Sequence, residues 1–158
     1  MKLKKIKSSI ANRIKHIYYL KCYYKKPIEE KVVLIESKQG EDIASNMFYV
    51  LKEIALNHKQ FKIKLSANSG KVNVFTKMLK QHKIENVEII IHKSFEYYKA
   101  LATAKYLFND TSFPMEFTKR EGQIYTNTWH GTPLKQMGQD VMDRKYAIRK
   151  CKKEFHVC

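Results

Sequence analysis

The chain has 158 residues, of which 44% are hydrophobic and 29% charged, so it can bury the core of one domain and is not a wholly disordered polypeptide. Its 31 basic and 15 acidic residues give a net charge of +16, which attracts nucleic acid, anionic lipid or phosphate-rich polymers, although lysines on a surface can also serve solubility alone. Only Arg13, Arg120, Arg144 and Arg149 are arginines, and because arginine is the usual reader of guanine edges, we expect no nucleic-acid partner.

Residues 1–26 are predicted to form a basic amphipathic helix. No acidic residue occurs before Glu29, and apolar residues recur at steps of three and four on one helix face: Leu3, Ile6, Ile10, Ile14, Ile17 and Leu20. Such a helix is typical of an anchor on an anionic membrane surface, and packing on its own domain is the alternative. Pro27 ends the helix, and residues 27–158 are predicted to form an α/β domain.

In that domain short apolar runs alternate with helical periodicity. Strands are predicted at 31–36, 61–65, 87–91, 105–108 and 124–129, and helices at 42–57, 72–82 and 94–103, the last with Ser94 as its N-cap. The alternation predicts an α/β, Rossmann-like fold with a mostly parallel sheet. Ligands of such sheets bind at the carboxyl ends of strands, so we expect the site in the loops after Glu36, Phe108 and Trp129. No glycine-rich dinucleotide or P-loop motif is present.

The loop after the last predicted strand has the most informative sequence. The strand ends at Trp129, His130 and Gly131 form a turn, and Thr132 caps a helix that begins with Pro133. A helix amino terminus offers free N–H groups and partial positive charge to a phosphate. An imidazole beside it is suited to taking a proton from a hydroxyl that attacks phosphorus, whereas a structural role in capping or packing is the alternative for His130.

Other residues near these loops are candidates for binding. Lys135, with Gly131 and the helix start at Thr132, would bind phosphate, and Asp140 would orient a ligand or remain a solvated loop residue. A second set of polar residues follows the fourth predicted strand and would line an acceptor cleft or serve ordinary turn formation: Asn109, Asp110 and Ser112.

The run Trp129-His-Gly-Thr-Pro-Leu-Lys135, followed by Gly138 and Asp140, resembles the signature of the CDP-glycerol glycerophosphotransferases, the teichoic acid primases and polymerases. Residues 104–110 and 117–125 resemble the family's lead-in to that motif, and residues 33–46 its first strand and loop. The resemblance implies the first domain of a glycosyltransferase-B-like fold. It also implies transfer of glycerol phosphate from CDP-glycerol to a lipid-linked acceptor with release of CMP, and His130 as the catalytic base.

The resemblance also implies a carboxy-terminal domain that binds CDP-glycerol, and we expect that domain to be absent from residues 27–158. Turnover by this chain alone is then not expected, and a membrane- or polymer-binding module without catalysis, or an inactive remnant, is the alternative. The expected place is the cytoplasmic face of a bacterial membrane, bound peripherally. Cys22, Cys151 and Cys158 lack the paired spacing of a zinc site, so neither a metal nor a cofactor is expected.

Overall fold

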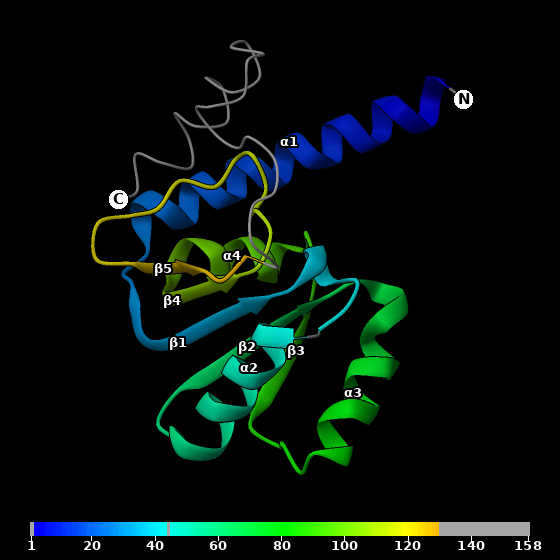
Figure 1. Ribbon diagram of the computed structural model, residues 1–158. Coiled ribbons are helices and arrows are strands. Elements are labelled where there is room, and N and C mark those ends of the chain that lie inside the picture. The colour runs from blue at the N-terminus through cyan, green and yellow to red at the C-terminus, as the bar shows by residue number, and fades with distance from the viewer. Residues whose placement is uncertain (1, 44, 130–158) are drawn as a thin grey trace, which may run out of the picture.

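The computed structural model describes residues 2–43 and 45–129, which form a five-stranded parallel sheet between two layers of helices (Figure 1). Strand order is β3-β2-β1-β4-β5, and every neighbouring pair is parallel. The strands are β1 (Glu29–Glu36), β2 (Lys62–Ala67), β3 (Val87–Ile91), β4 (Ala104–Asn109) and β5 (Ile124–Asn127). The helices are α1 (Lys2–Lys25), α2 (Ser45–Asn57), α3 (Val72–Gln81) and α4 (Phe95–Thr103). The α/β class and the parallel sheet predicted from the sequence are confirmed.

The central strand β1 is buried on both faces, which explains its uninterrupted apolar run. Val32 and Leu34 belong to the core formed with α1 and α4, whereas Val33 and Ile35 belong to the core formed with α2 and α3. Because successive side chains of a strand point to opposite faces, one apolar run supplies both cores. The predicted cap of α4 is present, since the hydroxyl of Ser94 accepts a hydrogen bond from the backbone N–H of Tyr97 at 3.1 Å.

Helix α1 packs on α4 with a face that includes Leu20 of the predicted apolar stripe but not Ile10, Ile14 and Ile17. Tyr19 and Cys22 are buried in the same core as α4 and β1, whereas Ile10, Ile14 and Ile17 are 51–61% exposed. The first turns of α1 extend beyond the sheet on the side toward which β1 runs (Figure 1). The division of the chain at residue 26 stays a prediction, and α1 contributes to the core of the α/β unit.

The connection between β4 and β5 departs from the predicted alternation, because residues 110–123 contain no helix. Hydrogen bonds to main-chain carbonyls replace a packed helix there. The Arg120 guanidinium donates to the carbonyls of Lys26 and Ala102, and the buried Gln123 amide donates to those of Leu101 and Ala104. These bonds start β5 next to β4 at the amino ends of both strands.

Candidate functional site at the carboxyl edge of the sheet

Polar side chains end three adjacent strands of the sheet. Glu36 ends β1, Asn109 ends β4 and Asn127 ends β5. The strand registers pair Glu36 with Asn109 and Asn109 with Asn127, so the three residues form one row across the carboxyl edge. Carboxyl edges of parallel sheets are where ligands bind in α/β proteins. The described part of the chain ends at Trp129, two residues after the end of β5, and His130 is the next residue in the sequence.

Glu36 is a completely buried carboxylate at the middle of this edge. Its Oε2 lies 3.0 Å from Nδ1 of His92, and its Oε1 accepts a hydrogen bond of 3.1 Å from Nδ2 of Asn109. The hydroxyl oxygen of Ser66 lies 3.3 Å from the same His92 nitrogen. Burial, and then the charge of Glu36, raise the pKa of Tyr97 well above its ordinary value. His92 and Asn109 therefore provide polar partners for a buried carboxyl group, whose burial without partners would be costly.

The loop after β1 is fixed by Asp110. The Asp110 carboxylate accepts hydrogen bonds from the Ser37 hydroxyl at 2.5 Å and from the backbone N–H of Lys38 at 2.9 Å. Lys38 and Gln39 have left-handed backbone conformations, as does Gly40 at φ +81°. A side chain at Gly40 would collide with the backbone that follows β2, so this loop lies directly against the neighbouring strand end.

The predicted residues of the acceptor cleft lie at this edge. Asn109 and Asp110 are buried and use their side chains in hydrogen bonds within the protein, while Ser112 is half-buried. Their role toward an acceptor stays a prediction. The other predicted residues lie outside the described part of the chain: His130, Gly131, Thr132, Lys135 and Asp140.

Sequence reasoning missed the roles of Glu36, His92 and Asn127 at this edge. His92 stands alone in the sequence, next to the end of a predicted strand, and no motif around it indicates a role. The available signal was positional: Glu36, Asn109 and Asn127 are each the last residue of a strand, and parallel strands bring such residues together. Among residues 2–43 and 45–129, no group of three or more His, Cys, Asp or Glu side chains is placed to hold a metal ion.

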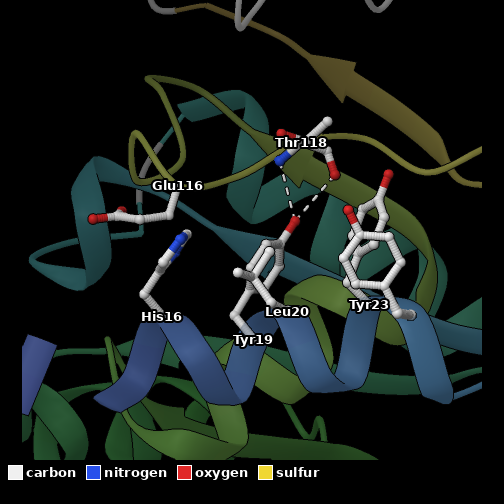
Figure 2. A pocket seen from close by; sticks show the side chains of 7 residues that line it. His16, Tyr19, Leu20, Tyr23, Glu116 and Thr118 are labelled. Atoms are coloured by element: carbon white, nitrogen blue, oxygen red, sulfur yellow. Dashed lines mark hydrogen bonds between the residues drawn. The ribbon is translucent and has the colours of Figure 1, made fainter. Parts of the chain in front are cut away.

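A separate cavity of about 320 Å³ lies between α1 and the connection that precedes β5 (Figure 2). Tyr19, Tyr23 and Tyr24 line it from α1, and Glu116 and Thr118 line it from the connection. The Tyr19 hydroxyl donates to the Thr118 carbonyl at 3.0 Å and accepts from the Thr118 N–H at 3.1 Å. Burial raises the pKa of Tyr19 to about 12, although the hydrogen bond from the Thr118 backbone opposes this effect.

Residues 18–157 match the family described as CDP-Glycerol:Poly(glycerophosphate) glycerophosphotransferase. The chain belongs to this family. It is 27% identical over 115 residues to the teichoic acid poly(glycerol phosphate) polymerase of Bacillus subtilis, covering 73% of this chain and 14% of that protein. It is 29% identical over 142 residues to the teichoic acid glycerol-phosphate transferase of Staphylococcus aureus, covering 89% of this chain and 34% of that protein. The family predicted from the residues around His130 is confirmed.

The described fold resembles solved structures of the wall teichoic acid polymerase TagF. One of them was soaked with CDPG; it has a TM-score of 0.75 and 22% sequence identity, and the match covers 96% of this chain and 38% of that one. The glycosyltransferase-B-like architecture expected from the resemblance is thereby confirmed for this part of the fold. The matches cover 14% of the Bacillus subtilis polymerase and 34% of the Staphylococcus aureus transferase, so this chain spans about a third or less of the length of these two relatives.

Proposed function

We propose that this chain is the acceptor-side part of an enzyme that transfers glycerol phosphate from CDP-glycerol to a lipid-linked acceptor, with release of CMP. The observation that carries the proposal is the family match over residues 18–157, which includes the run from Trp129 to Lys135. In the sequence that run begins two residues after the end of β5, and the carboxyl end of β5 lies at the edge of the sheet where α/β proteins bind ligands.

In the proposed reaction His130 takes the proton from a hydroxyl of the acceptor. The hydroxyl oxygen forms a bond to the β-phosphorus of CDP-glycerol, and the bond from that phosphorus to the oxygen of CMP breaks, so CMP leaves with the bonding electrons. The N–H groups near Gly131 and Thr132 and the ammonium of Lys135 would stabilise the charge on the phosphoryl oxygens. Asp140 would orient the ligand, and a further domain would contribute to binding CDP-glycerol.

The exposed side of α1 supports a second part of the proposal, binding to a membrane surface. Ile10, Ile14 and Ile17 are 51–61% exposed and form an apolar stripe, and exposed Arg13 and Lys21 flank it. An apolar stripe with cationic flanks binds anionic lipid by combining apolar burial with electrostatic attraction. Among residues 2–43 and 45–129, no helix is both long and apolar enough to cross a bilayer. We propose that the stripe binds peripherally at the cytoplasmic face, where it would bring the site to a lipid-linked acceptor.

The two parts can be tested separately. Flotation with anionic and neutral vesicles tests membrane binding, and we expect the triple variant Ile10→Ser, Ile14→Ser, Ile17→Ser to lose binding to anionic vesicles. Val74→Ser, at an equally exposed apolar residue on α3, is the matched control. Flotation that survives the triple variant would remove the stripe from the account.

The alternative function is a membrane- or polymer-binding module without catalysis, which the same exposed stripe favours. It would bind anionic vesicles, yet the gene product from its source cells would release no CMP from CDP-glycerol when acceptor is supplied. CMP release that depends on acceptor would exclude this alternative.

A further inference from the structure

We propose that Asn127 is a positioning residue for His130, acting at the end of a hydrogen-bonded relay that begins at the buried Glu36. The inference rests on the proposed function, because it assumes that His130 acts as the base. It concerns residues on the described strands, and Asn127 is none of the residues that the motif itself suggests.

The relay crosses three strands through hydrogen bonds between side chains and between side chains and backbone. Glu36 accepts from Nδ2 of Asn109 at 3.1 Å, and Oδ1 of Asn109 accepts from the backbone N–H and the hydroxyl of Thr111. The carbonyl of Thr111 accepts from Nδ2 of Asn127 at 2.7 Å, and Oδ1 of Asn127 accepts from the backbone N–H of Trp129 at 2.9 Å. Glu36 and Asn109 are thus bonded directly, Asn109 and Asn127 are linked through Thr111, and the last bond reaches the residue before His130.

The final bond is placed where the chain changes direction. Trp129 has φ +48°, a left-handed conformation that a residue with a Cβ rarely adopts. Asparagine side chains stabilise turns by accepting from the backbone N–H two residues on, and Asn109 and Asn127 both do so at adjacent strand ends. A second main-chain bond, from the N–H of Thr128 to the carbonyl of Asn109 at 2.9 Å, holds the same turn. His130 follows Trp129 directly in the sequence, so the proposal is that the conformation held at Trp129 influences the placement of His130.

The starting point of the relay is rigid. Glu36 and Asn109 are both completely buried, and His92, whose side chain is 7% exposed, holds the other carboxylate oxygen of Glu36. A buried carboxylate that lost a partner would be costly, so its partners are held in place. The relay therefore connects the turn at Trp129 to side chains that are held in place at the centre of the sheet. Small errors in the position of a catalytic group cost large factors in rate, which gives such a support its value.

Two variants of Asn127 separate positioning from general stability. Asn127→Ala removes the side-chain bonds to Thr111, Tyr125 and Trp129, whereas Asn127→Asp keeps an oxygen that can accept from the Trp129 N–H. Gln123→Leu is the matched control, because it removes a buried amide at the opposite end of the same pair of strands. Amide hydrogen exchange of the ¹⁵N-labelled 158-residue chain reports the Trp129 bond, and CMP release by the gene product purified from its source cells reports catalysis.

We expect Asn127→Ala to speed exchange of the Trp129 amide by about tenfold, the effect of losing one hydrogen bond. We expect the same variant to lower kcat for CMP release about tenfold or more with the KM for acceptor unchanged. Asn127→Asp should recover most of both effects, and Gln123→Leu should cause neither.

The inference is overturned if exchange at Trp129 is unchanged in Asn127→Ala, or if kcat is unchanged although exchange is faster. It is also overturned if Gln123→Leu lowers kcat as much as Asn127→Ala, since the effect would then reflect stability alone. If His130→Ala abolishes CMP release while Asn127→Ala does not affect it, the inference fails and the proposed function stands. If His130→Ala has no effect, the proposed function itself fails.

Discussion

Gly40 is the residue at which the smallest substitution should have the largest structural effect. Its φ of +81° is a conformation that side chains disfavour, and an added Cβ would lie 2.9 Å from the backbone nitrogen of Asn68 and 3.0 Å from the carbonyl carbon of Ala67. The carbonyl of Gly40 also accepts a hydrogen bond of 2.8 Å from that Asn68 nitrogen. Because both close atoms are backbone, a side-chain rotation cannot relieve the collision.

The expected cost of Gly40→Ala has two parts. The left-handed conformation costs a residue with a Cβ about 1–2 kcal/mol. Separating the loop from the end of β2 weakens or breaks the bond to Asn68, which adds about 1 kcal/mol. We therefore expect the free energy of unfolding to fall by about 2–3 kcal/mol. Gly70→Ala is the matched control, since nothing lies within 4 Å of its added Cβ and its φ is not left-handed. We expect its effect to be within about 1 kcal/mol.

Urea denaturation of the wild type and both variants, followed by circular dichroism, measures these differences. The reasoning requires a lower midpoint for Gly40→Ala with an unchanged slope. Equal midpoints for Gly40→Ala and Gly70→Ala would refute it, because they would mean that the loop does not lie against the end of β2.

Two further substitutions test the packing of α1 and an ion pair at the sheet surface. Tyr19→Phe should lower the free energy of unfolding by about 1–2 kcal/mol in urea titrations, because both hydrogen bonds to Thr118 are lost. The Tyr19 pKa of about 12 exceeds the ordinary value of 10, so the unfolded chain releases this proton first as pH rises. Wild-type stability therefore falls between about pH 10 and 12, and Tyr19→Phe should reduce that fall. Identical dependence of stability on pH in the wild type and Tyr19→Phe would contradict the assignment. Lys64 lies 2.9 Å from both Glu88 and Glu96, and we expect Lys64→Met to cost about 0.5–1 kcal/mol at low salt and less at high salt. The hydrogen bond from Lys64 lowers the pKa of Glu96, so the ion pair's contribution to stability is present above the ordinary glutamate pKa and is lost as pH falls through the lowered pKa. If Lys64→Met lowers the free energy of unfolding equally at every pH and salt concentration, the ion pair does not contribute.

The sequence predicted the sheet because each strand is either buried on both faces or bounded by clear turn residues. Val32 to Ile35 form an apolar run too short for a helix, and the structure places it at the centre of the sheet. The connection from β4 to β5 was not predictable in the same way. Its order comes from long-range bonds of Arg120 and Gln123 to carbonyls that precede them by about 20 to 90 residues, and no local pattern encodes such bonds.

The stripe on α1 shows a different limit. Periodicity correctly placed Ile10, Ile14 and Ile17 on one face, but it could not tell which face packs on the domain. Tyr19 and Cys22 form the buried face because they fit against α4, and that fit depends on tertiary shape.

The candidate site, like the fold, could be predicted only in part from the sequence. The motif after Trp129 could be found in the sequence because its residue types and spacing are specific. The relay through Glu36, Asn109 and Asn127 could not, because those residues are separated by 73 positions or by a whole connection and meet only through strand register.

The most direct test of the account compares CMP release from CDP-glycerol by the wild-type gene product with that of His130→Ala, each purified from its source cells and supplied with acceptor. His58→Ala is the control, because His58 is an exposed histidine beyond α2 and far from the carboxyl edge in sequence. The account predicts acceptor-dependent CMP release that falls by a factor of about 10² to 10⁴ in His130→Ala and is unchanged in His58→Ala. Equal rates for the wild type and His130→Ala would contradict it.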